Sequence, residues 1–91
     1  MPNRIKLIIK GRVQGVFFRR FAKQTADSIG IKGYVRNLPD GSVEVVAECS
    51  EPKLKEFLVF CRKGPKGANV TNIQVLEHPS KNEFIDFSIS C

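Results

Sequence analysis

Residues 11–21 read GRVQGVFFRRF. They follow a segment, residues 4–10, in which apolar and polar side chains alternate as in a strand, and they precede an apolar pattern with helical spacing. Glycines let the backbone turn so that several N–H groups face one point, and a helix start adds unpaired N–H groups. The guanidinium of Arg19 adds a planar charged fork suited to phosphate or carboxylate. The stretch therefore predicts a binding site for a small phosphorylated ligand.

Outward from this stretch, the sequence predicts the order β-α-β-β-α-β plus one extra C-terminal strand. The expected strands are residues 4–11, 31–38, 43–49, 70–77 and 83–90, with a turn at residues 78–82. The expected helices are residues 19–29 and a second helix that Ser50 caps and Gly64-Pro65 ends. Two helices with apolar stripes on one face of a mainly antiparallel sheet make a two-layer α+β sandwich of the ferredoxin-like kind. We expect residues 1–91 to form one such domain, although this architecture hosts many functions.

Charge and composition limit the class of partner. The chain has a formal net charge of +6 and an isoelectric point near 9.6, which favours an anionic partner, but a solvated basic surface is an equal alternative. The sequence has no run of 18 apolar residues, so it predicts no membrane-spanning helix. The N-terminus leads straight into a strand without a signal-peptide pattern, which favours the cytoplasm.

The cysteines give no pattern of metal ligands. Cys49, Cys61 and Cys91 form no C-x-x-C pair, and His78 is the one histidine, so we expect no zinc site. Cys61 falls on the apolar face of a predicted helix and is expected to be buried. A bridge between Cys49 and Cys91 stays open, with free thiols favoured in a cytosolic protein.

Two residues are candidates for chemistry, each with a structural alternative. Arg19 would bind a phosphate dianion, or it is a surface arginine of the helix. Arg20 lies about 100° further around the helix and is expected to be solvated and outside the site. Asn37, at a strand end beside a turn, bonds local backbone or holds a water. An amide cannot deprotonate water at neutral pH, so its substrate would be a labile ester or anhydride.

The loop residues have more ordinary expected roles. Gln14 orients the loop, donates to a ligand or is simply a solvent-facing loop residue. Phe17 and Phe18 are expected to anchor the core rather than to stack on a ligand, with Phe18 matching the helical stripe. No Ser-His-Asp, Cys-His or paired-carboxylate arrangement can be found, so a covalent nucleophile is not indicated.

Two stretches of this chain resemble the signatures of a known family. Residues 11–19 resemble the first signature of the acylphosphatases, G-x-V-Q-G-V-x-F-R, and residues 33–37 resemble the second, G-x-V-x-N. The hairpin at residues 39–45 and the segment that begins at Gly64-Pro65 also fit, so the similarity covers essentially the whole chain. Its length suits a stand-alone member.

The resemblance implies a metal-free, cofactor-free hydrolase that cleaves the carboxyl–phosphate anhydride of acyl phosphates. Arg19 would then bind the phosphoryl group, and Asn37 would orient the water that attacks phosphorus. The resemblance implies a small acyl phosphate as substrate, inorganic phosphate or other small anions as ligands, no nucleic acid, no membrane and a monomer. The loop expected to hold the phosphate comprises Gln14, Gly15, Val16, Phe17 and Phe18.

Two other classes of function remain as alternatives. RNA-recognition domains share the β-α-β-β-α-β order, and Lys32-Gly33-Tyr34 begins like their signature, but residues 35–37 do not continue it. A regulatory domain that binds a phosphorylated metabolite would use Arg19 without turnover. Binding and hydrolysis assays distinguish these classes.

Overall fold

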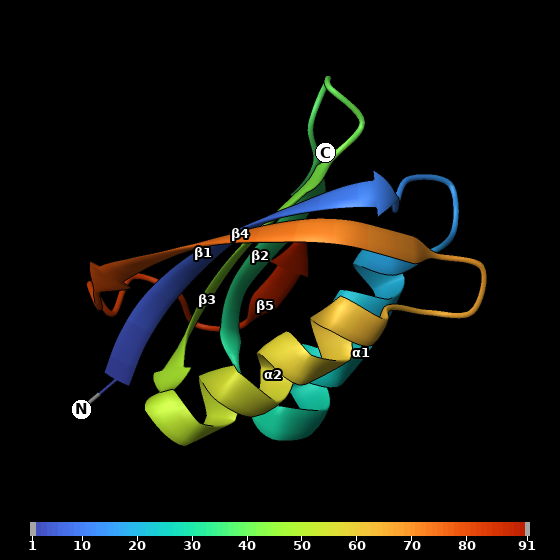
Figure 1. Cartoon of the computed structure of the whole chain (residues 1–91). Helices are drawn as coiled ribbons and strands as arrows, with labels where there is room; N and C mark the ends of the chain where they lie inside the picture. Colours follow the sequence, from blue (N-terminus) through green and yellow to red (C-terminus); the bar gives the residue numbers. More distant parts are fainter. Residues whose placement is uncertain (1, 91) are drawn as a thin grey trace.

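Two helices and five strands follow one another in the predicted order, in a computed structural model that describes residues 2–90 (Figure 1). The strands are hydrogen-bonded in the order β4-β1-β3-β2-β5, and only the β2–β5 pair is parallel. Both helices lie on one face of this sheet, which confirms the expected α+β sandwich of the ferredoxin-like kind. The elements are β1 (Pro2–Arg12), α1 (Phe18–Ile29), β2 (Lys32–Asn37), β3 (Val43–Ser50), α2 (Glu51–Lys63), β4 (Asn69–Pro79) and β5 (Phe87–Ile89).

The core lies between the sheet and the two helices. Alternate residues of the central strands point toward the helices, as the period of two requires, and the helices answer with residues three or four apart. The Phe57 ring of α2 meets the Phe87 ring of β5 edge-on, with centroids 6.0 Å apart. The buried side chains from β1, β3, α1 and α2 include Ile5, Leu7, Ile9, Val43, Val45, Ala47, Phe18, Ala22, Ala26, Leu54, Phe57 and Cys61.

The end of the second helix follows the sequence signals, but its start follows them only in part. Pro52 lies in the first turn of α2, and Gly64 ends the helix with its N–H bonded to the Phe60 carbonyl oxygen at 2.8 Å. Ser50 occupies the N-cap position, yet its hydroxyl makes no capping hydrogen bond. The expectation that Ser50 caps this helix through its side chain is therefore wrong.

The last two strands differ in length from the prediction. β4 continues through His78 and Pro79, which were expected to form a turn, because the long strand β1 provides partners as far as the Asn3–Pro79 pair. β4 is an edge strand, where proline is tolerated. β5 is limited to Phe87–Ile89, so residues 83–86 lie outside the sheet. No helix in the described range, residues 2–90, is long and apolar enough to cross a membrane.

Candidate active site

The loop between β1 and α1 bends sharply just before the helix. Gly15 and Phe17 both have left-handed backbone conformations, with φ of 76° and 64°. At the helix start, the Phe21 N–H donates to the Phe17 carbonyl oxygen at 3.0 Å. Phe17 is the N-cap residue and provides no side-chain cap, so the N–H groups of the first helical turn remain available to an anion.

The second part of the site is the hairpin between β2 and β3. Asn37 is the last residue of β2, and beyond it the Leu38 N–H donates to the Ser42 carbonyl oxygen at 2.9 Å. The Asp40 carboxylate accepts hydrogen bonds from the Ser42 hydroxyl and from the Ser42 N–H, the latter at 3.0 Å. These bonds lower the pKa of Asp40 below its ordinary value and hold the turn in shape.

Gln14 joins the loop to the hairpin. Its side-chain nitrogen donates to the Leu38 carbonyl oxygen at 2.8 Å and to the Ser42 carbonyl oxygen at 2.9 Å. Of the three alternatives left open for Gln14, these contacts match the one in which its side chain orients the loop. The loop and the hairpin consequently lie together at one end of the sheet, far from the N-terminus (Figure 1).

Both candidate residues line one pocket at this end of the sheet. The pocket has a volume of about 320 Å³. Arg19 and Asn37 are each half-buried, and the hydrogen bonds and ion pairs found within residues 2–90 leave both side chains unengaged. The guanidinium of Arg19 and the free carboxamide of Asn37 thus line the same small pocket. The residues that line it are Val13, Gly15, Phe17, Phe18, Arg19, Arg20, Asn37 and Ile89.

Three aromatic and basic neighbours show where the sequence-based expectations succeed and fail. Phe18 is buried as expected, but Phe17 is 74% exposed, so its expected role as a core anchor is wrong. The left-handed turn at Phe17 directs its ring away from the core. Arg20 is exposed as predicted, yet it lines the same pocket as Arg19. Its guanidinium carbon lies over the Phe17 ring, 5.8 Å from the ring centroid. The expectation that Arg20 lies outside the site is wrong.

Besides Arg20, two pocket residues, Val13 and Ile89, were not among the predicted site residues, and Ile89 lies far from them in the sequence. Ile89 comes from the last strand, and it reaches the pocket because β5 pairs in parallel with β2 beside Val35. No local sequence signal predicts that pairing, since it depends on the order of strands in the finished sheet.

Other chemistry-bearing side chains lie elsewhere or are inert. Within residues 2–90, no group of three His, Cys, Asp or Glu side chains is close enough to hold a metal ion. Cys61 is a buried free thiol, as predicted, and burial raises its pKa to about 12. Such a thiol is a poor nucleophile at neutral pH. Cys49 is also free, and Cys91, the other end of the alternative bridge, lies outside the described residues.

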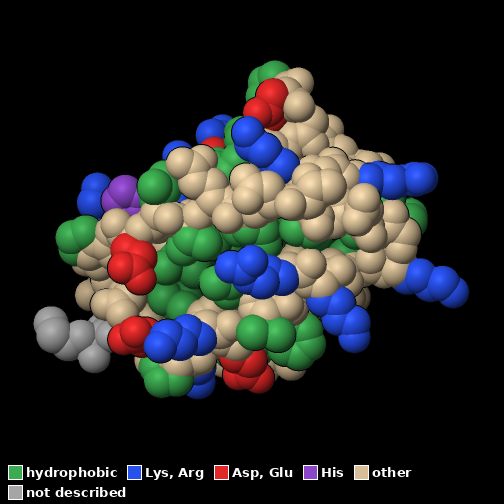
Figure 2. All heavy atoms as spheres, in the orientation of Figure 1, with side chains coloured by type: hydrophobic (Ala, Val, Ile, Leu, Met, Phe, Trp, Pro, Cys, Tyr) green, Lys and Arg blue, Asp and Glu red, His purple; other side chains and the backbone are tan. Residues whose placement is uncertain are grey.

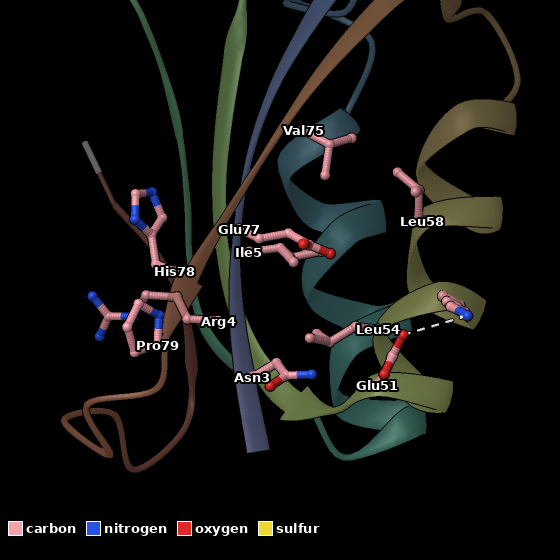
Figure 3. A pocket seen from close by; sticks show the side chains of 11 residues that line it. Asn3, Arg4, Ile5, Glu51, Leu54, Leu58, Val75, Glu77, His78 and Pro79 are labelled. Carbon is pink, nitrogen blue, oxygen red and sulfur yellow. Dashed lines mark ion pairs between the residues drawn. The ribbon is translucent and has the colours of Figure 1, made fainter. Parts of the chain in front are cut away.

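A second hollow, of about 520 Å³, lies between α2 and the strands β1 and β4 (Figure 3). Leu54, Leu58 and Val75 face one another across it, and Glu77 points toward it from β4, whereas the His78 side chain points away from α2. Apolar side chains are visible inside this hollow on the surface of the molecule (Figure 2). It contains neither Arg19 nor Asn37, so it is separate from the candidate active site.

Comparisons with known proteins show the family of this chain. The chain matches the acylphosphatase family over residues 5–89. It is 43% identical over 87 residues to an acylphosphatase of Methylococcus capsulatus, covering 96% of this chain and 95% of that protein. An acylphosphatase of Marinobacter nauticus is 45% identical over 85 residues, covering 93% of this chain and 92% of that protein.

A solved structure gives the same answer for the fold. The crystal structure of an acylphosphatase from Bacillus subtilis superposes on this chain with a TM-score of 0.95 at 38% identity, and each chain is covered completely. Sequence and fold therefore point to the same group of proteins. The chain belongs to the acylphosphatase family of hydrolytic enzymes.

Proposed function

We propose that this protein hydrolyses acyl phosphates to a carboxylate and inorganic phosphate without a metal ion or a covalent intermediate. The observation that carries the proposal is that Arg19 and Asn37, from different elements, line one pocket together with Gly15. Phosphoryl transfer needs mainly positioning and charge stabilisation, and these residues offer both.

Arg19 and the backbone of residues 14–18 would bind the phosphoryl group. The guanidinium presents parallel N–H donors that match two phosphoryl oxygens. The left-handed residues Gly15 and Phe17 turn the chain just before the uncapped helix start, so its amides can add further donors. Donors fixed before the reaction stabilise the charge that builds up in the transition state.

Asn37 would position the attacking water. Its carboxamide oxygen accepts a hydrogen bond and its nitrogen donates one, so it can orient a water without taking a proton from it. The water oxygen forms a bond to phosphorus while the bond from phosphorus to the carboxyl oxygen breaks. The electron pair of that bond leaves with the carboxylate, and the water's proton passes to a phosphoryl oxygen of the substrate. Because a carboxylate is a good leaving group, little acid catalysis is needed.

The test is hydrolysis of benzoyl phosphate in the presence of EDTA by the wild-type protein and by Arg19→Ala and Asn37→Ala. We expect metal-independent turnover that each substitution lowers by about 100- to 1000-fold, the usual cost of removing one preorganised donor. Titration with inorganic phosphate separates the roles, since Arg19→Ala should weaken phosphate binding and Asn37→Ala should leave it nearly unchanged.

Arg62→Ala is the matched control, because Arg62 is an exposed arginine in the last turn of α2, away from the pocket. Substantial turnover by Asn37→Ala would remove the water-positioning role. Phosphate binding without turnover by the folded wild type would instead favour the regulatory domain, and salt-sensitive binding of single-stranded RNA would favour the RNA-binding class.

A further inference from the structure

Phe17 is the feature of the site that phosphate binding leaves unexplained. Its side chain is 74% exposed, although an exposed phenyl ring gains nothing for folding. Its backbone is also left-handed, with φ 64° and ψ 26°, a conformation that bulky residues rarely adopt. Strained residues of this kind gather at ligand sites, where the surroundings hold them in place. Contact with part of a bound substrate would explain why the Phe17 ring is exposed.

The pocket has room for more than a phosphoryl group. Cavities of roughly 300–1,000 Å³ hold small organic molecules, and this one has about 320 Å³. An acyl phosphate brings an acyl group that must lie somewhere next to the bound phosphate.

The direction of attack restricts where the acyl group lies. In-line displacement places the leaving carboxylate opposite the water, and the proposed function puts that water at Asn37. Ile89 belongs to the strand beside β2 and lies on the Asn37 side. The remaining lining residues belong to the loop and to α1, and Val13 and Phe18 among them are buried at 1% exposure. Phe17 alone offers exposed apolar surface on that side.

We propose that the Phe17 ring is the acyl-binding wall of the pocket and selects acyl phosphates whose acyl group is aromatic or otherwise apolar. The inference rests on the proposed hydrolysis of acyl phosphates. Arg20 holds the ring by lying over it at 5.8 Å, so the ring is positioned before the substrate binds. An aromatic acyl group then packs against the ring in an offset or edge-on arrangement.

The experiment compares kcat/KM for benzoyl phosphate with kcat/KM for acetyl phosphate. Phe17→Asn removes the ring while keeping a residue that tolerates the left-handed backbone. We expect the benzoyl-to-acetyl ratio to fall by about 3- to 10-fold in Phe17→Asn. The ratio should stay at the wild-type value in Phe17→Tyr, which restores the ring, because intrinsic differences in substrate reactivity cancel in this comparison.

Two measurements separate failure of this inference from failure of the proposed function. Inhibition by inorganic phosphate should be the same in all variants, and Phe60→Ala, which removes an exposed phenyl ring from α2, should keep the wild-type ratio. An unchanged ratio in Phe17→Asn, with turnover retained, would overturn the acyl-binding role alone. An equal loss for both substrates would also overturn it, since the ring would then only shape the loop. If the wild type hydrolysed neither substrate, both proposals would be overturned.

Discussion

Gln14 shows how one side chain can set the distance between two parts of the candidate active site. Its two hydrogen bonds, to the carbonyl oxygens of Leu38 and Ser42, hold the loop of the proposed phosphate site against the hairpin that follows Asn37. The nitrogen uses both of its N–H groups in this role. A carboxylate at the same position would place an acceptor against two acceptors.

We therefore expect Gln14→Glu to lower kcat for benzoyl phosphate by up to about 100-fold, because small misplacements of reacting groups are costly. Unfolding in urea should show a loss of about 1–3 kcal/mol, since each carbonyl oxygen loses one of its donors and meets the new carboxylate instead. Gln74→Glu on the exposed edge strand β4 introduces the same charge and should change neither quantity. Equal kinetics for Gln14→Glu and wild type would show that the bridge does not position the site.

At the same scale, the limits of the sequence are clear. The two signatures predicted Arg19 and Asn37, and the structure brings both into one pocket. The direction of the Phe17 ring was not predictable, because side-chain periodicity assumes helical or extended backbone and Phe17 is in neither. Ile89 depends on a contact between distant strands, which local patterns do not encode.

At the scale of elements, the face of the sheet opposite the helices carries a polar and aromatic layer. Residues 80–86, between β4 and β5, lie over part of this face. Phe84 meets Tyr34 edge-on at 6.0 Å, and the Arg4 guanidinium lies over the Phe84 ring at 5.0 Å. Arg4 also pairs with Glu48 at 2.7 Å. An RNA-recognition domain stacks bases on this face of its sheet, whereas here the aromatic rings are paired with each other.

Glu44 is one of two buried acids in this layer, the other being Glu48, and its titration predicts how stability depends on pH. Burial raises the pKa of Glu44, but hydrogen bonds from the Tyr34 hydroxyl at 2.6 Å and from Arg36 at 3.0 Å outweigh it. The net pKa lies below the ordinary value of 4.5. As the pH falls, Glu44 is therefore protonated in the unfolded chain before it is protonated in the folded protein. The contribution of ionised Glu44 to the free energy of unfolding is complete above about pH 4.5 and is lost as the pH falls through the folded pKa.

We expect Glu44→Gln to lower the free energy of unfolding by about 1 kcal/mol or more at pH 7, because a charged acceptor is lost. The difference from wild type should shrink as the pH falls below about 4.5, which urea unfolding at several pH values measures. Glu56→Gln, at an exposed position of α2, is the matched control. A difference that is independent of pH would contradict the role of the ionised Glu44.

The element boundaries explain a second limit of sequence reasoning. The helix ends were predictable because proline, glycine and basic residues act locally. The strand ends were not, because β4 continues for as long as β1 offers partners, through His78 and Pro79. Residues 83–86 precede the paired part of β5: Glu83 and Phe84 contact side chains of the sheet face, and only at Asp86 does the backbone bond to β2, where its carbonyl oxygen accepts from the Gly33 N–H at 2.9 Å.

At the scale of the whole molecule, the excess of positive charge acts on every approaching anion. The formal net charge is +6, and the protein measures 34 × 23 × 23 Å. At about 10 mM ionic strength the Debye length is near 30 Å, so charges anywhere on the surface reach the pocket. At about 150 mM it falls to roughly 8 Å, and only nearby charges remain effective.

We therefore expect kcat/KM for an acyl phosphate to fall several-fold between about 10 and 150 mM salt, while kcat stays constant, because attraction speeds the encounter and not the chemistry. The double variant Lys53→Glu and Lys66→Glu changes two exposed lysines outside the pocket and lowers the formal charge from +6 to +2, two units for each substitution. Its kcat/KM should be lower at 10 mM salt and should approach the wild-type value at 150 mM. Salts of anions that differ in size, compared at equal ionic strength, separate screening from competition. Screening depends on ionic strength alone, so a difference between the salts would indicate competition at the proposed phosphate site. Parallel salt profiles for the two proteins would show that Arg19 and its neighbours draw the substrate without help from the remaining surface.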